Sequence, residues 1–225
     1  MKHRWTAFLG AFLLIVASQL WAAEHRVEML SEGPPGEVPQ AVAATLSPKG
    51  LKVIRGTKRT VCEIWLAKAW PVSADFTPTA QVLYPFEPGQ LIGAIHFTGK
   101  GHDFRDQEIP EGVYTLRYGQ QPVDGNHVGT SPTQDFLVLI RADQDTSPAP
   151  IPPKELLKRS ATSVESTHPG ILCLQKLSGE PDSQPALVHN EERDWWILRL
   201  QGAATAGEKQ QPLTLDLVVV GTSEG

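Results

Sequence analysis

Histidine, acidic and arginine side chains gather between residues 100 and 135, and they include the groups best suited to chemistry. The candidate metal ligands are His102, Asp103, Asp106, His127 and Asp135. Imidazole and carboxylate groups bind divalent metals, and they also act as acids and bases in hydrolases. The two histidines lack the helical i, i+4 and the strand H-x-H spacing of a strong metal motif. A strand predicted over residues 112–118 spans about 23 Å and separates them. The sequence therefore predicts a metal site only if one loop folds back.

A second set of residues from the same region is suited to binding an anionic ligand. Its members are Arg105, Arg117, Tyr118, Asp124 and His127. Arg117 shares a strand face with apolar residues, so its half-buried guanidinium requires an acceptor. The acceptor is either an anionic ligand or an internal carboxylate, from Asp103, Asp106 or Asp135. The internal pair is favoured because buried ionised groups are generally paired within the protein.

Two familiar motifs are matched only superficially. Residues 221–225 read G-x-S-x-G, but the nucleophile elbow needs a following helix and none is encoded there. Residues 99–104 begin like a dinucleotide-binding loop, yet the third glycine is replaced by Phe104 and no helix follows. No motif therefore requires a cofactor, and the identity of any cofactor stays unknown.

The first residues have the layout of a secretory signal peptide. Lys2 and Arg4 precede an uncharged stretch over residues 5–21, and the small residues Ala22 and Ala23 follow. The apolar run is short for a membrane anchor, which needs about 20 residues. The sequence predicts cleavage after Ala22 or Ala23, with a signal peptide over residues 1–22 and no stable membrane span afterwards. The protein is expected to be exported, to the periplasm or outside the cell.

The two cysteines, Cys62 and Cys173, both fall in the exported part of the chain. An oxidising compartment permits a disulfide between them, which would close a very long loop. Both neighbourhoods are apolar, so two buried free thiols are the alternative. Sequence alone leaves the two possibilities equal.

The spacing of apolar and turn residues predicts many short strands and little helix. Strands are expected over residues 26–30, 51–54, 59–70, 91–98, 112–118, 136–140, around 173, 195–200 and 213–220. The strand over residues 136–140 is apolar throughout, as expected where both faces are covered. Short helices are expected over residues 39–46 and 153–161, the second with Pro153 at its first position. The pattern predicts an all-β fold, a jelly-roll-like antiparallel β-sandwich forming one domain over residues 23–225.

Composition limits the class of partner. The 225 residues are 40% hydrophobic and 20% charged, which argues against a disordered chain. Without residues 1–22 the chain keeps 18 basic and 25 acidic residues, for a net charge of −7. An acidic chain without a basic face is not expected to bind nucleic acid. A small molecule, a carbohydrate or another protein is the expected partner, and Trp65, Trp70, Trp195 and Trp196 are able to stack on sugars.

Several short runs carry a resemblance to a known group of proteins. They cover residues 63–66, 89–93, 103–107, 112–118, 121–122, 124–125, 127–129, 135–137 and 168–169. These runs resemble a family of uncharacterised secreted bacterial proteins, over roughly residues 50–175. The resemblance implies a secreted β-sandwich and supplies no catalytic residue.

Two classes of function are consistent with these observations. The first is a non-catalytic module that binds a ligand or a partner, because no strong catalytic motif is present. The alternative is a periplasmic hydrolase, with or without a metal, that uses the histidine and aspartate loops around residues 102–135.

Overall fold

A computed structural model of the chain describes residues 24–121, 131–179 and 185–223. The predicted signal peptide, Asp124 and His127 lie outside the described residues. The described chain is mostly β-strand, with two α-helices and one 3-10 helix.

The strands are β1 His25–Leu30, β2 Gly50–Arg55, β3 Arg59–Leu66, β4 Trp70–Pro71, β5 Leu91–Phe97, β6 Gly101–His102, β7 Glu108–Ile109, β8 Gly112–Gln120, β9 Asp135–Arg141, β10 Ile171–Gln175, β11 Ala186–Asn190, β12 Trp195–Ala206 and β13 Lys209–Val220. The helices are α1 Gln40–Ala43, η1 Ala142–Gln144 and α2 Pro153–Ser163.

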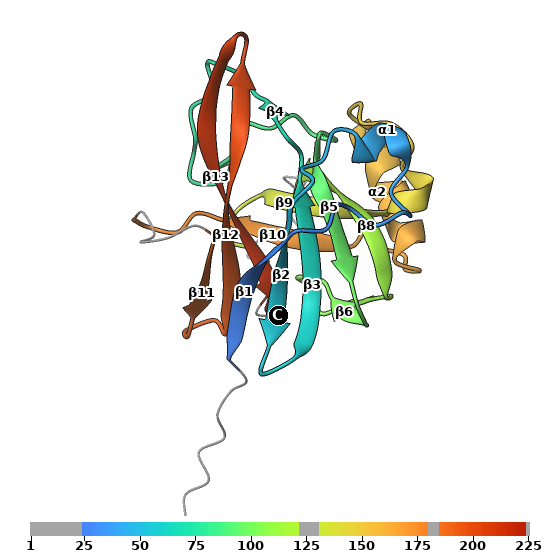
Figure 1. Cartoon of the computed structure of the whole chain (residues 1–225). Helices are drawn as coiled ribbons and strands as arrows, with labels where there is room; N and C mark the ends of the chain where they lie inside the picture. The colour runs from blue at the N-terminus through green and yellow to red at the C-terminus, as the bar shows by residue number, and fades with distance from the viewer. Residues whose placement is uncertain (1–23, 122–130, 180–184, 224–225) are drawn as a thin grey trace, which may run out of the picture.

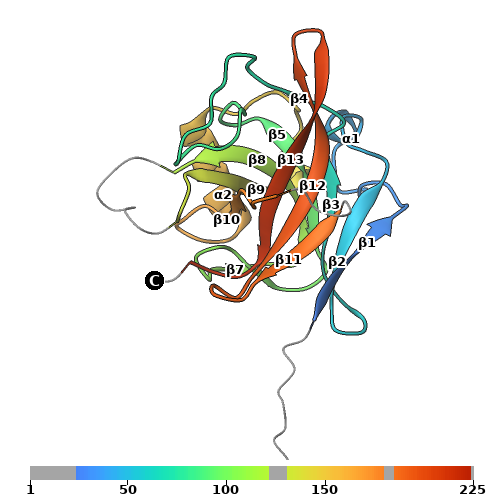
Figure 2. The same cartoon turned by 90° about the vertical axis from the view of Figure 1, so that its left-hand side faces the viewer.

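Ten of these strands form one hydrogen-bonded path in the order β1-β2-β3-β5-β8-β9-β10-β13-β12-β11, with antiparallel neighbours. Strand β4 pairs with β12 in parallel, and β6 and β7 form a separate pair. The sheet curls until its two edge strands, β1 and β11, lie side by side (Figure 1). Strands β12 and β13 form a long hairpin that crosses in front of the rest of the sheet in Figure 2. The curl brings the first and last thirds of the chain together.

The apolar pattern of β9 explains where the helix packs. Leu137 and Leu139 point into the main core inside the curl. Val138 and Ile140 point to the other face, where they pack with Leu156 of α2. Successive strand residues face opposite sides, so a strand that is apolar throughout must be covered on both. The prediction of a doubly covered strand is confirmed.

The all-β prediction is confirmed, and both predicted helices are present, although α1 has only four residues. The pairing links the strands into one curled sheet, so the division into two facing sheets is not confirmed. The sequence did not predict β6, β7 or β11, nor the outer half of the β12–β13 hairpin. That half is rich in small residues and includes Gly202, where a Cβ atom would come within 2.2 Å of the Trp70 ring. Close packing against Trp70, rather than strand propensity, explains the glycine.

Candidate functional site

The seam between β1 and β11 is closed at one end by a stack of aromatic rings. The Trp196 ring lies 4.6 Å from the His25 ring and 4.4 Å from the His189 ring, centroid to centroid. His189 is held by a 2.8 Å contact from its Nε2 to Oδ1 of Asp194. The neighbouring Trp195 is buried and packs in a second core cluster. Neither tryptophan therefore presents an open platform for a sugar ring.

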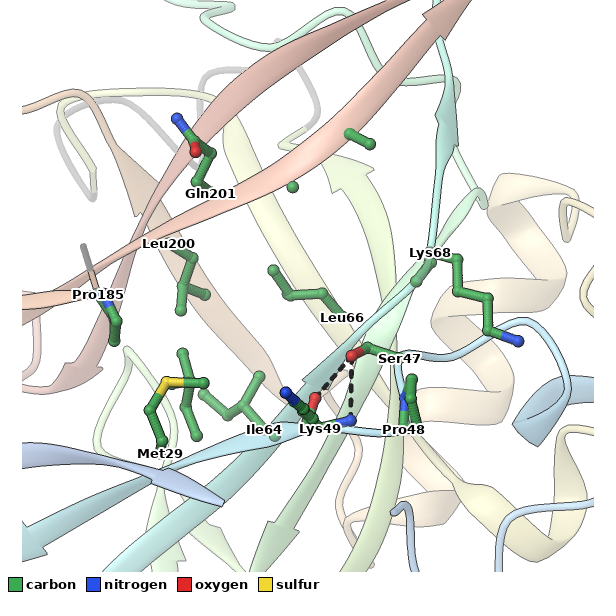
Figure 3. Close-up of a pocket in the computed structure, with 15 residues that line it drawn as sticks. Met29, Ser47, Pro48, Lys49, Ile64, Leu66, Lys68, Pro185, Leu200 and Gln201 are labelled. Carbon is green, nitrogen blue, oxygen red and sulfur yellow. Dashed lines mark hydrogen bonds between the residues drawn. The ribbon is translucent and has the colours of Figure 1, made fainter. Parts of the chain in front are cut away.

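The other end of the seam is open and forms a cleft of about 650 Å³ (Figure 3). Its lining comes from β1, from β2 and β3 with the segments beside them, from Pro185 just before β11, and from β12. The lining residues are Met29, Ser47, Pro48, Lys49, Gly50, Leu51, Ile64, Leu66, Ala67, Lys68, Pro185, Leu200, Gln201, Gly202 and Ala203. Small-molecule sites typically have volumes of about 300–1,000 Å³, so this cleft has the size of a ligand site.

Strand register explains why the cleft is apolar. Met29 pairs with Leu51 and Leu51 pairs with Ile64, so one row of side chains crosses β1, β2 and β3 on a single face. Leu200 of β12 approaches this row from across the seam (Figure 3). Met29 belongs to the same inward row yet is 63% exposed, the largest exposure among the large apolar side chains described. This methionine faces inward but stays exposed to solvent, because no residue of the described chain fills the cleft.

The polar groups of the cleft offer little chemistry. Ser47 Oγ donates to the Lys49 carbonyl at 2.8 Å and accepts from the Lys49 amide at 3.1 Å, so its hydroxyl serves the local turn. Lys68 Nζ donates to the Ala44 carbonyl at 2.7 Å and points away from the cleft in Figure 3. The described lining residues include no histidine, cysteine or carboxylate. The cleft therefore presents an apolar floor with one exposed lysine, Lys49, at its edge.

Arg117, predicted to meet either a ligand or an internal carboxylate, is fully buried and satisfied inside the protein. Its Nε and Nη2 donate to the two carboxylate oxygens of Asp145 at 2.8 and 2.9 Å. Nη1 also donates to the carbonyls of Gly89 and Ala149, and Nη2 to that of Ser147. All five guanidinium N–H groups are thus used. Arg117 binds loops to the sheet and has no donor left for a ligand.

The partner of Arg117 differs from the three carboxylates that the sequence favoured. Asp103, Asp106 and Asp135 all lie elsewhere, and the pairing residue is Asp145, just after η1 and 28 residues along the chain. Gly89 approaches through a backbone φ of +86°, and a Cβ there would meet the Ile151 carbonyl oxygen at 1.9 Å. Only glycine brings this carbonyl close enough to reach the guanidinium.

Tyr118 and Asp135 form a second internal network. The Tyr118 hydroxyl donates to Asp135 Oδ1 at 2.5 Å and accepts from Gln120 Nε2 at 3.0 Å. Asp135 Oδ2 accepts from the Leu83 amide at 2.8 Å. Burial raises the pKa of Asp135, against the lowering effect of these hydrogen bonds. Both side chains hold the loop before β5 on the sheet, and neither is open to a ligand.

The loop around residue 103 is organised by its own buried aspartate. Asp103 Oδ1 accepts from the amides of Arg105 and Gln107 at 2.8 and 2.9 Å. Its Oδ2 accepts from Arg105 Nη2 at 3.2 Å, and the same Nη2 also donates to the Pro169 carbonyl. This carboxylate is used in holding the loop, and Arg105 is bound to it.

His102 and Asp106 pair with each other, with 2.7 Å between Nδ1 and Oδ1, and both side chains are more than half exposed. Within the described ranges no three His, Cys, Asp or Glu side chains come together as a metal site would require. The predicted metal ligands thus belong to three separate hydrogen-bonded groups: His102 with Asp106, Asp103 with its own loop, and Asp135 with Tyr118. The fifth predicted ligand, His127, lies outside the described residues.

The two cysteines are separate buried thiols. Cys62 lies on β3 and Cys173 on β10, and neither is bonded. Cys173 Sγ accepts from Gln175 Nε2 at 3.0 Å and lies 3.3 Å from Ser131 Oγ. Burial raises the pKa of the Cys62 thiol to about 12. Of the two possibilities that the sequence left open, the structure has the free thiols.

Sequence reasoning missed the cleft and a second buried ion pair. Arg199 of β12 donates to both oxygens of Asp216 on β13, at 2.6 and 2.8 Å. The two residues face each other in the β12–β13 register. Alternation within the two predicted strands could have placed one opposite the other. No local signal marks the cleft, whose walls are more than 110 residues apart in the chain.

Comparison of the chain with protein-family models, with curated proteins and with solved structures found no match. Among the residues that the structure describes, no helix is long and apolar enough to cross a membrane. The function must therefore be inferred from the geometry of the pockets and from the residues that line them.

Proposed function

We propose that this protein is an exported, non-catalytic binding protein that takes a small apolar ligand into the cleft between β1–β3 and β12. The observation that carries the proposal is Met29, which faces inward with the core row and yet is 63% exposed. A ligand that covers Met29 and the floor formed by Leu66 and Leu200 would remove apolar surface from water. Such burial is worth about 25 cal/mol for each Å².

The rim of the cleft favours a ligand with an anionic end. Lys49 is exposed and lines the cleft, and the described lining residues carry no negative charge. An ammonium group at the edge of an apolar floor fits an amphipathic molecule whose apolar part enters first. The ligand class we propose is therefore a small apolar anion.

The test measures binding of 1-anilinonaphthalene-8-sulfonate, an apolar anion whose fluorescence rises on burial. Met29→Glu places a negative charge in the cleft at a position that is already wet, so the fold should be little affected. We expect the Kd of the probe to rise at least about tenfold, since burying a methionine side chain is worth about 1.5–3 kcal/mol. Val188→Glu is the matched control, because Val188 is a 38% exposed apolar residue on neighbouring β11 and does not line the cleft.

Unchanged probe binding in Met29→Glu, or an equal loss in Val188→Glu, would reject the cleft as the ligand site. Thermal unfolding of both variants is measured alongside, because a partly unfolded variant would bind the probe more strongly rather than less.

The hydrolase alternative has weaker support. It needs the histidine and aspartate loops to share one site, whereas Asp103 is used within its loop and Asp135 pairs with Tyr118. Export rests on the charge and hydropathy pattern of residues 1–23. Mass spectrometry of the natively expressed protein should find a chain that begins at Ala23 or Glu24. A cytoplasmic chain with Met1 intact would contradict export.

A further inference from the structure

A row of three basic side chains crosses β1, β2 and β3 at the end opposite the cleft. His25 pairs with Arg55, and Arg55 pairs with Arg59, so all three side chains lie on the same face of the sheet. This is the face that carries Met29 further along β1. The row therefore faces the inside of the curl at its far end.

The two arginines of the row have no side-chain partner among the residues that the structure describes. Like charges directly opposite in a strand pair are destabilising, and Arg55 and Arg59 form no ion pair or side-chain hydrogen bond within the described chain. Arg26, the next residue to His25 but on the other face of β1, has its Nε 2.9 Å from Glu28 Oε1 and also donates to the Gly56 carbonyl. In the described chain the arginine on the outer face is thus paired, whereas Arg55 and Arg59 are exposed and unpaired.

His25 is the third unpartnered group, and it is buried. Its ring is covered by Trp196, it is only 8% exposed, and both ring nitrogens are without a hydrogen-bond partner among the described residues. A buried polar group without a partner costs about 1–3 kcal/mol. Burial and the neighbouring Arg55 lower the pKa of His25, so near neutral pH its imidazole offers one donor and one acceptor.

These groups line a pocket of about 610 Å³ that is separate from the cleft. Phe97, Val219 and Val220 form its apolar wall. Other charged and histidine side chains of the lining are already paired: Lys100 with Glu108 at 2.8 Å, and His102 with Asp106, a carboxylate that also lines the pocket, at 2.7 Å. Among the arginine, lysine, histidine and acidic side chains of the lining, those without a partner in the described chain are therefore the two guanidiniums and the buried imidazole.

We propose that this pocket is a second ligand site, which binds a small organic phosphate through Arg55, Arg59 and His25. Two unpaired guanidiniums match the charge of a phosphomonoester, which is close to −2 at neutral pH. Guanidinium groups bind phosphate oxygens with paired hydrogen bonds, and a buried imidazole N–H supplies a further donor. The pocket is much larger than a phosphate group, so its apolar wall receives the organic part.

The experiment titrates phenyl phosphate into the purified protein and follows binding by calorimetry. We expect saturable binding that weakens about tenfold to hundredfold in Arg59→Gln and in Arg55→Gln, because each removes charge-assisted hydrogen bonds. Either substitution also relieves the opposition of like charges, so the unfolding midpoint should stay the same or rise. Loss of binding in a variant of equal or higher stability cannot come from misfolding.

Arg26→Gln is the matched control, since it removes the same charge one residue from His25 on the opposite face. It should bind phenyl phosphate with the affinity of the natural protein. An equal loss of affinity in Arg26→Gln would mean that the overall positive charge of this region, and not the pocket, attracts the anion. His25→Phe, which retains a ring against Trp196, should bind more weakly.

Benzoate, a monoanion with the same ring, should bind at least about tenfold more weakly than phenyl phosphate. Equal affinity for benzoate would overturn the assignment to a phosphate. An absence of saturable phenyl phosphate binding below about 10 mM would overturn the site itself.

Discussion

Replacement of Arg117 by methionine should destabilise the protein severely, although the residue touches no ligand. Arg117 has no exposed side-chain surface, and Asp145 has 2%. The substitution removes five donors and leaves the Asp145 carboxylate and the carbonyls of Gly89, Ala149 and Ser147 short of partners. Breaking a buried ion pair on one side costs about 3–5 kcal/mol. For a domain of this size that lowers the unfolding midpoint by about 6–20 °C.

The assay is thermal and urea unfolding followed by circular dichroism. Arg26→Met is the control, because the Arg26–Glu28 pair is about half exposed and should contribute less than about 1 kcal/mol. The double variant Arg117→Met/Asp145→Leu should recover part of the loss, since it leaves no buried charge unpaired. Arg159, 3.7 Å from Asp145, softens the effect but is itself partly exposed. A cost below about 1 kcal/mol for Arg117→Met would refute the reasoning.

Two further predictions concern the thiols and the buried histidine. Cys62 and Cys173 should resist a thiol reagent in the folded protein, because both are buried and burial raises the pKa of Cys62 to about 12. Unfolding without reductant should yield two thiols, because the cysteines are not bonded to each other. The absence of a titratable thiol after unfolding would contradict this prediction. Burial and Arg55 lower the pKa of His25 in the folded protein below its ordinary 6.5. The imidazole therefore binds a proton more tightly in the unfolded chain than in the folded one. The free energy of unfolding should fall as the pH drops through 6.5 toward the folded pKa. His25→Phe should lose less stability than the natural protein between pH 7 and pH 5 in urea unfolding, and an equal loss would contradict the assignment.

The secondary structure was predictable where the local pattern and the tertiary environment agree. Strand β9 has apolar residues on both faces because the core covers one and α2 the other. Helix α2 begins at Pro153, a residue whose fixed φ suits the first helical position. Strand β11 was not predicted, since its residues are only half-buried and its pattern is weak.

Several polar residues of the predicted sites have partners within the protein, for a physical reason. Composition showed that the segment over residues 100–135 is rich in carboxylates and arginines, but hydrogen-bond partners are chosen in three dimensions. Asp145 reaches Arg117 because η1 returns the chain to the sheet. Asp103 binds amides of its own loop instead.

The sequence by itself determined the all-β class and the positions of most strands and both helices, because alternation and turn residues act over a few neighbouring positions. It also showed that Arg117 needs an acceptor, because a buried guanidinium must be paired. Only the tertiary structure decided which acceptor that is, and only it produced the two pockets. The cleft joins Met29 to Leu200, and the basic pocket joins His25 to Val220. Such residues meet only after the sheet has curled, which no local pattern encodes.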